Sequence, residues 1–110
     1  ENLDAILGVE GVDAIYVGPA DLSLSYGYGP AYSDDNEEYK QVLEHIVERC
    51  NKAGKVAGIH STSALAANRR EKGFMMQTIS GDIAAVAKGS YRDLKTAVEG
   101  GAGDGSSKIY

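Results

Sequence analysis

The chain has 110 residues, a formal net charge of −5 and a single cysteine. This length suffices for one domain with a modest core. The acidic balance argues against binding to nucleic acid, which requires clustered basic residues. The apolar runs are too short to cross a bilayer, so we expect no membrane span. Because Cys50 cannot form an internal disulfide, the composition suits a reducing cytoplasm, and we expect this residue to be buried in a helix.

The chain is organised around its first strand-like stretch. Residues 14–18 read Ala-Ile-Tyr-Val-Gly, an apolar run without strict alternation, which predicts a strand buried on both faces, as in parallel sheets. Gly18 and Pro19 end this strand, because proline has no N–H for the next ladder bond. Asp21 follows at the carboxyl end, where a carboxylate is a natural ligand for a hard divalent cation. We expect residues 19–33 to form a long loop of the kind that often carries function.

Helical and strand-like patterns alternate along the rest of the chain. In the helical stretches, apolar residues recur at spacings of three and four. Asp34 and Glu37 have the spacing of a capping box at the start of the clearest amphipathic helix. Gly89 separates the last two helices. The expected helices lie at residues 1–8, 34–53, 61–72, 83–88 and 90–98, and the other expected strands at residues 55–60 and 74–80.

This alternation predicts an α/β fold with parallel strands and right-handed crossovers. We expect residues 1–99 to form a partial barrel domain and residues 100–110, which are rich in Gly and Ser, to form a flexible tail. Three strands leave a sheet with two edges that need cover.

His60 ends the second expected strand, at the same level as Asp21 if the strands are parallel. Its imidazole is open to two interpretations: a pocket-lining or proton-relaying group, or a histidine capped within a loop. Small residues before it, including Gly58, suit a crowded barrel interior or close contact with a ligand.

Two other groups of side chains stand out. Cations in the last turn of the helix at residues 61–72, among them Arg69, complement the negative end of that helix. Three tyrosines after the first strand either line a pocket or an interface, or cover apolar surface; these are Tyr26, Tyr28 and Tyr32.

Residues 11–23, Gly-Val-Asp-Ala-Ile-Tyr-Val-Gly-Pro-Ala-Asp-Leu-Ser, closely resemble a known family. It is the HpcH/HpaI aldolase/citrate lyase family of 2-oxo-acid aldolases, which includes the 2,4-dihydroxyhept-2-enedioate aldolases. Residues 53–59, 72–74 and 80–82 follow in the family's order, and the resemblance reaches about Val98.

The resemblance implies that the chain is the C-terminal part of a (β/α)8 barrel and covers its last three strands. It implies reversible cleavage of a 4-hydroxy-2-oxo acid to pyruvate and an aldehyde, with Mg²⁺ or Mn²⁺ as Lewis acid. Asp21 matches one of two metal-binding carboxylates. Gly18, Pro19, Ala20 and His60 correspond to positions around the substrate, although the family usually has an apolar residue at the position of His60.

The resemblance also places the other metal carboxylate, the catalytic histidine and a carbonyl-polarising arginine before Glu1. We therefore expect the isolated chain to be an inactive fragment of a lyase with no catalytic residue of its own. Exchange of a last helix between subunits, common in such enzymes, implies a homo-oligomer.

Two alternatives remain open. In the first, the chain is a non-catalytic half-barrel stabilised by homo-oligomerisation, because its sheet edges need cover. In the second, it is a flavodoxin-like binding module, although no glycine-rich phosphate loop follows a strand.

Overall fold

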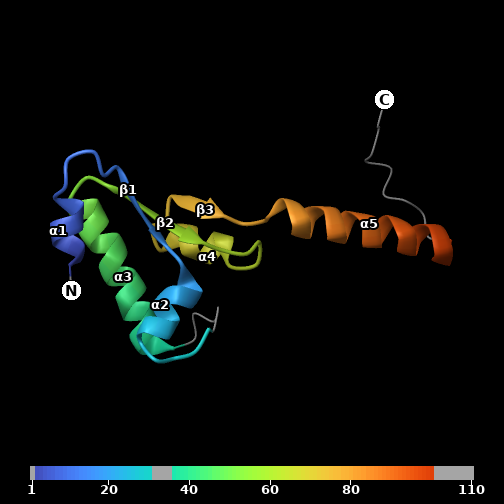
Figure 1. The fold of residues 1–110 in the computed structure, drawn as a ribbon, viewed down its shortest axis with the longest axis horizontal. Coiled ribbons are helices and arrows are strands. Elements are labelled where there is room, and N and C mark those ends of the chain that lie inside the picture. The colour runs from blue at the N-terminus through green and yellow to red at the C-terminus, as the bar shows by residue number, and fades with distance from the viewer. Residues whose placement is uncertain (1, 31–35, 101–110) are drawn as a thin grey trace. The chain divides into compact units, whose positions relative to one another are not determined.

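The computed structural model describes residues 2–30 and 36–100, and the chain divides into two compact units, residues 1–79 and 80–110. The first unit contains all three described strands, and the second contains the last helix (Figure 1). Apart from Gly100, the expected tail lies outside the described residues. The elements are α1 (Leu3–Leu7), β1 (Ala14–Val17), α2 (Pro19–Ser25), α3 (Glu37–Lys52), β2 (Val56–His60), α4 (Ala66–Glu71), β3 (Met76–Thr78) and α5 (Asp82–Glu99).

The three strands form one parallel sheet in the order β1-β2-β3. Helical segments follow each of the first two strands and bring the chain back to the sheet, which is the geometry that parallel pairing requires. Tyr16 of β1 pairs with Gly58 of β2, and Gly58 pairs in turn with Met76 of β3. The prediction of alternating helices and parallel strands is therefore confirmed.

One face of the sheet carries the core of the first unit. Ala57 and Ile59 of β2 point to this face and are almost completely buried. Helix α3 packs against β2, and α1 packs against α3 (Figure 1). The buried apolar residues are Leu7, Val17, Tyr39, Leu43, Val47, Cys50, Ala57, Ile59 and Phe74.

The opposite face of the sheet is largely exposed, and we call it the open face. Tyr16, Val56 and Met76 lie on it with 45%, 41% and 42% of their surface exposed. Because successive strand residues point to opposite sides, the open face holds every second residue of each strand. Its members are Ala14, Tyr16, Val56, Gly58, His60, Met76 and Thr78.

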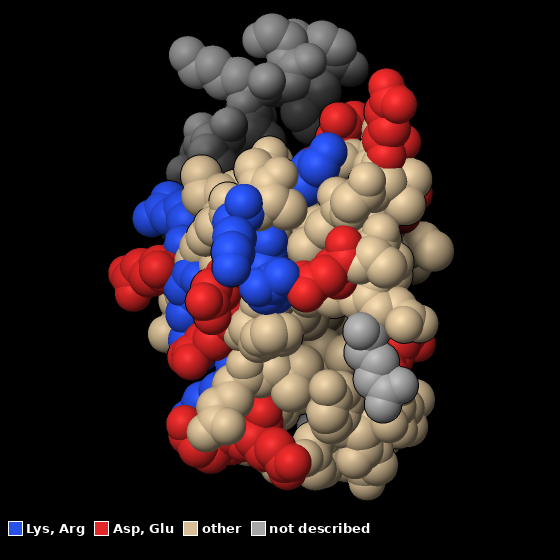
Figure 2. Space-filling model, turned by 90° about the vertical axis from the view of Figure 1, so that its left-hand side faces the viewer, with Lys and Arg blue, Asp and Glu red and all other residues tan. Residues whose placement is uncertain are grey.

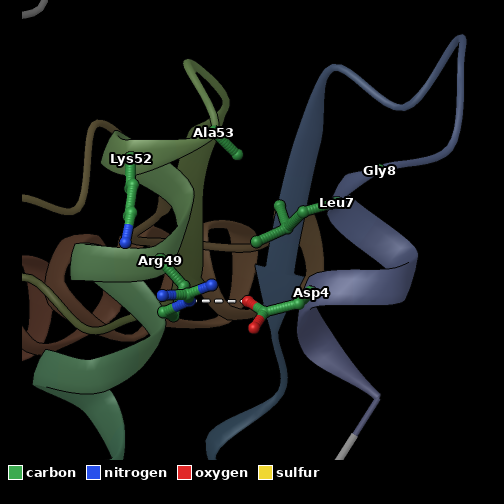
Figure 3. A pocket seen from close by; sticks show the side chains of 6 residues that line it. All are labelled: Asp4, Leu7, Gly8, Arg49, Lys52 and Ala53. Carbon is green, nitrogen blue, oxygen red and sulfur yellow. Dashed lines mark hydrogen bonds and ion pairs between the residues drawn. The ribbon is translucent and has the colours of Figure 1, made fainter.

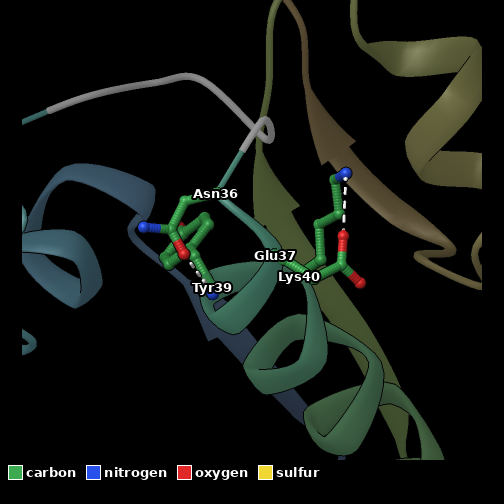
Figure 4. A network of polar contacts seen from close by, with 4 residues as sticks. All are labelled: Asn36, Glu37, Tyr39 and Lys40. Carbon is green, nitrogen blue, oxygen red and sulfur yellow. Dashed lines mark hydrogen bonds and ion pairs between the residues drawn. The ribbon is translucent and has the colours of Figure 1, made fainter.

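Helix α3 begins after Asn36, whose side-chain oxygen accepts a hydrogen bond of 2.9 Å from the backbone N–H of Tyr39 (Figure 4). This bond satisfies one of the amides that lack a partner at a helix start. In the same turn, Lys40 forms an ion pair of 3.2 Å with Glu37. The capping-box prediction involved Asp34, which lies outside the described residues.

Three expectations about local structure were wrong. The first strand was expected to be buried on both faces, but Tyr16 of β1 is exposed on the open face, because α3 packs against the other face of the sheet. The segment expected to start a long loop forms α2, because Pro19 at the first helical position loses no hydrogen bond and Asp21 in the first turn suits the positive helix end. The expected break at Gly89 is absent, and α5 is continuous. A single glycine costs a helix only about 1 kcal/mol, so the surrounding helical residues carry the helix through it.

The prediction of a buried Cys50 is confirmed, since its side chain on α3 is fully buried. Burial raises the pKa of the Cys50 thiol, because the thiolate would lose its hydration.

We expect a thiolate-labelling disulfide reagent at about pH 8 to react at least about tenfold more slowly with the folded chain than with the unfolded chain. Because folding raises this pKa, the free energy of unfolding should fall as the pH rises above about 8.5. Equal labelling rates for the folded and unfolded chains would contradict the buried position.

Candidate functional site

Parallel pairing brings the carboxyl ends of the three strands to one edge of the sheet. The last residues of these strands are Val17, His60 and Thr78. The backbone N–H of Ser61 donates a hydrogen bond of 2.8 Å to the carbonyl of Thr78, which ties the loop after β2 to the end of β3. Ligands of open parallel sheets and barrels bind at this edge, so it is the first place to look for a site.

Asp21 lies at this edge, in the first turn of α2. Its carboxylate folds back over the end of β1, since Oδ2 lies 2.6 Å from the position that a Cβ atom on Gly18 would occupy. A side chain at position 18 would therefore displace the carboxylate. Gly18 follows Val17, whose side chain faces the core, and its backbone is still extended. Strand alternation therefore places the space filled by the carboxylate toward the open face.

Two hydrogen bonds, one buried and one partly buried, hold α2 and the residues that follow it. The hydroxyl of Tyr39 on α3 donates a bond of 3.2 Å to the carbonyl of Pro19, and only 2% of Tyr39 is exposed. The hydroxyl of Ser23, equally buried, donates a bond of 2.5 Å to the carbonyl of Gly29. The sequence patterns did not reveal these contacts, because Tyr39 lies 20 residues after Pro19 and reads as an ordinary core residue.

His60 is exposed and lies on the open face, as the register requires. Its backbone carbonyl accepts a bond of 2.6 Å from Nη1 of Arg69, whose side chain is fully buried. The sequence interpretation of Arg69 as a cation at a helix end therefore missed this contact with the end of β2. Arg69 thus holds His60 through its backbone carbonyl, and within the described residues no side-chain hydrogen bond engages the exposed imidazole.

Tyr16 and Thr78 are two further residues of this edge that sequence reasoning missed. The hydroxyl of Tyr16 donates a hydrogen bond of 2.8 Å to Oγ1 of Thr78. The only hint in the sequence is Gly58, a glycine within a strand, which often marks a close approach of another group.

The described residues do not form a metal site by themselves. Among them, no group of three or more His, Cys, Asp and Glu side chains is placed to hold a cation. Asp21 offers one carboxylate, whereas divalent cations such as Mg²⁺ require several oxygen ligands. A cation at this edge would need further ligands from outside the described residues.

The tyrosines after β1 pack on one another. The rings of Tyr26 and Tyr28 stack with centroids 6.1 Å apart. The hydroxyl of Tyr28 donates a hydrogen bond to Glu38, and this bond raises the pKa of Tyr28 because ionisation would remove the proton that forms it. Tyr32 lies outside the described residues. These contacts favour the interpretation that Tyr26 and Tyr28 cover surface.

A separate hollow of about 370 Å³ lies where α1 and α3 end (Figure 3). Asp4 and Arg49 form an ion pair of 2.5 Å within it. Both helices lead from here into the starts of β1 and β2, so the hollow lies at the amino ends of the strands. Residues at that end of a barrel serve stability, and we do not consider this hollow a candidate active site.

One face of the molecule carries charged side chains of both signs. On the face in Figure 2, Lys and Arg side chains lie beside Asp and Glu side chains, with uncharged residues between them. Among the helices that the structure describes, none combines the length and apolar character needed to span a bilayer.

Comparison with known proteins identifies the family. The sequence profile of the HpcH/HpaI aldolase/citrate lyase family matches residues 1–90. The chain belongs to this family. The predicted family is thereby confirmed, and so is the fold class: parallel strands alternating with helices, in the α/β arrangement of the C-terminal part of a (β/α)8 barrel.

Individual proteins align with between about half and nearly all of the chain. It is 37% identical to a hydroxypyruvate/pyruvate aldolase of Pseudomonas aeruginosa over 99% of this chain and 41% of that protein. It is 48% identical to a 2-keto-3-deoxy-L-rhamnonate aldolase of Salmonella paratyphi B over 53% of this chain and 21% of that protein. The solved structure of a family protein from Burkholderia cenocepacia J2315 superimposes with a TM-score of 0.74 and 26% identity, over 87% of this chain and 37% of that chain.

The chain therefore spans about two fifths or less of the length of the relatives that it matches. Its parallel strands bring Asp21 and His60 to the same edge of the sheet, as the sequence predicts.

The bond from Tyr39 to Pro19 leads to a test of how α2 is held. Replacing Tyr39 with Phe keeps the buried ring and removes the hydroxyl donor. We expect the free energy of unfolding to fall by about 1 kcal/mol, and amide exchange to speed up at Leu22, whose N–H bonds to the carbonyl of Gly18. The matched control is Tyr91→Phe on α5, where an exposed ring should make a change below about 0.5 kcal/mol. Equal effects of the two variants would show that the Tyr39 hydroxyl does not support α2.

Proposed function

We propose that this chain supplies the carboxyl-terminal strands of a divalent-metal-dependent aldolase that cleaves 4-hydroxy-2-oxo acids to pyruvate and an aldehyde. The observation that carries the proposal is the Asp21 carboxylate, folded over Gly18 at the carboxyl edge of a parallel sheet. Membership of an aldolase family supports the reaction class, and relatives named as pyruvate aldolases support a 2-oxo acid as the substrate.

The residues of this edge take distinct roles in the proposal. Asp21 provides one ligand to Mg²⁺ or Mn²⁺, and such a cation would polarise the carbonyl of the 2-oxo acid as a Lewis acid. The backbone of Gly18, Pro19 and Ala20 borders the substrate, because this turn begins α2 and the amides of Ala20 and Asp21 have no partner within the helix. His60 lines the pocket from β2. The remaining ligands and the proton-transferring groups belong to strands outside these residues.

Asp21→Asn tests the proposed metal ligand. The chain is co-expressed with the part of the Pseudomonas aeruginosa relative that precedes the matched segment, and pyruvate release from a 4-hydroxy-2-oxo acid is measured with Mn²⁺. We expect kcat/KM to fall at least about a hundredfold, because an amide cannot replace the charge of a carboxylate ligand. The matched control is Asp13→Asn, which changes an exposed carboxylate at the amino end of the same strand and should leave kcat/KM within about twofold.

Two outcomes would contradict the proposal. The first is equal activity of the Asp21→Asn and Asp13→Asn complexes, which would remove Asp21 from the metal site. The second is a complex that assembles but releases no pyruvate with any 4-hydroxy-2-oxo acid tried. That result would favour the second candidate function, described next.

The second candidate is a non-catalytic half-barrel stabilised by homo-oligomerisation. The open face favours it, because side chains such as Tyr16 and Met76 leave apolar surface without cover in the first unit. On this view the purified chain forms a dimer or larger assembly without an added partner. A monomer by light scattering at about 10–100 μM would contradict it, since interfaces of ordinary size reach affinities tighter than this.

We also propose a reducing location such as the cytoplasm, on the ground that Cys50 is a buried free thiol.

A further inference from the structure

Three polar side chains share the open face near the carboxyl edge of the sheet. His60 and Thr78 are direct register partners on β2 and β3, so their Cα atoms lie about 4.8 Å apart. Tyr16 is the register partner of Gly58, which lies two residues before His60 on β2. The alternation of strand residues therefore places Tyr16 on the same face as His60. All three are exposed. The other face, in contrast, carries the buried apolar residues Val17 and Ile59.

Tyr16 reaches from β1 across the central strand to β3. Its hydroxyl bonds to Oγ1 of Thr78 at 2.8 Å. The ring can lie over β2 because Gly58 has no side chain: a Cβ there would be 2.9 Å from Cδ2 of Tyr16 and 2.7 Å from Cε of Met76. Gly58 thus makes room for one aromatic side chain that fixes the orientation of the Thr78 hydroxyl.

The hydrogen bond from Tyr16 leaves the Thr78 hydroxyl able to donate at the carboxyl edge of the sheet. Because Tyr16 gives its proton to Thr78, the Thr78 hydroxyl keeps its own proton for another acceptor. In the part of the chain that the structure describes, no side-chain hydrogen bond engages the His60 imidazole, which has at least one N–H. The Thr78 hydroxyl and the His60 ring therefore both offer a donor on the same side as the Asp21 carboxylate.

We propose that Tyr16, His60 and Thr78 form a polar subsite that selects the aldehyde partner of the reaction. The subsite binds an oxygen substituent, a hydroxyl or a carboxylate, on the carbon next to the aldehyde group. The inference rests on the proposed function, because the aldehyde must lie beside a 2-oxo acid bound near Asp21. Thr78 and His60 donate to the substituent, and Tyr16 is a positioning residue that acts through Thr78. An alkyl aldehyde of the same size leaves both donors without an acceptor, which carries a free-energy cost.

The kinetic test compares glycolaldehyde with propionaldehyde, which replaces its hydroxyl by a methyl group. Aldol addition of pyruvate is measured with the co-expressed complex, and the ratio of the two kcat/KM values is followed. We expect Thr78→Val and His60→Leu each to lower this ratio about tenfold, since one hydrogen bond to the substituent is lost. The matched control Thr96→Val, on α5, should leave the ratio unchanged. 3-Oxopropanoate, which carries a carboxylate in place of the hydroxyl of glycolaldehyde, shows which of the two substituents is preferred.

A second measurement uses the 110-residue chain without activity. The chain has two histidines, and His45 is exposed on α3 away from the strand ends. Addition of 1,2-propanediol or acetate is followed by the imidazole NMR signals. We expect the His60 signals to move and those of His45 to stay, with the diol reporting hydroxyl recognition and acetate reporting carboxylate recognition. Thr78→Val should reduce the movement of the His60 signals.

The outcomes separate the two proposals. An active complex whose aldehyde ratio is unchanged by Thr78→Val and His60→Leu would overturn the polar subsite and leave the proposed function standing. An inactive complex with selective movement of the His60 signals would overturn the proposed function, and with it the role in aldehyde selection, while supporting a binding site for an oxygen substituent at His60 and Thr78. Equal movement of the His45 and His60 signals, or none, would overturn the subsite.

Discussion

The parallel pairing of β1, β2 and β3 is the constraint on which the rest of the structure depends. It sends the side chains of Ala57 and Ile59 into the core beneath α3, and those of Tyr16 and His60 to the open face. Since all three strands run in one direction, their carboxyl ends meet at one edge. Asp21 reaches that edge only because the chain turns into α2 immediately after Gly18.

Much of this arrangement follows from the sequence. Alternating strand and helix patterns predict parallel pairing, and the abrupt stop at Gly18 and Pro19 predicts where β1 ends. With both in place, Asp21 and His60 must lie at the same edge. The run of residues 11–23 also indicates the family, which hydrophobic periodicity alone does not reveal. These features depend on short stretches of chain, and local signals suffice for them.

The features that the sequence did not predict depend on contacts between distant residues. Arg69 reads as a cation at a helix end, yet its guanidinium is buried against the carbonyl of His60. The bond between Tyr16 and Thr78 joins residues 62 positions apart across Gly58. Such contacts depend on tertiary packing. A residue whose local sequence pattern already has an adequate explanation can therefore take a different role in the folded chain.

The central claim is that the Asp21 carboxylate marks a cation-binding edge shared by β1, β2 and β3. Paramagnetic broadening by Mn²⁺ tests it most directly, because broadening in NMR spectra reveals even a weakly held ion. Titration of the 110-residue chain should broaden the amide signal of Asp21 first and those of His60 and Thr78 next. The amide of Val56, at the amino end of β2, should change little. Broadening centred on the acidic start of α3 instead, or spread evenly over the chain, would contradict the account.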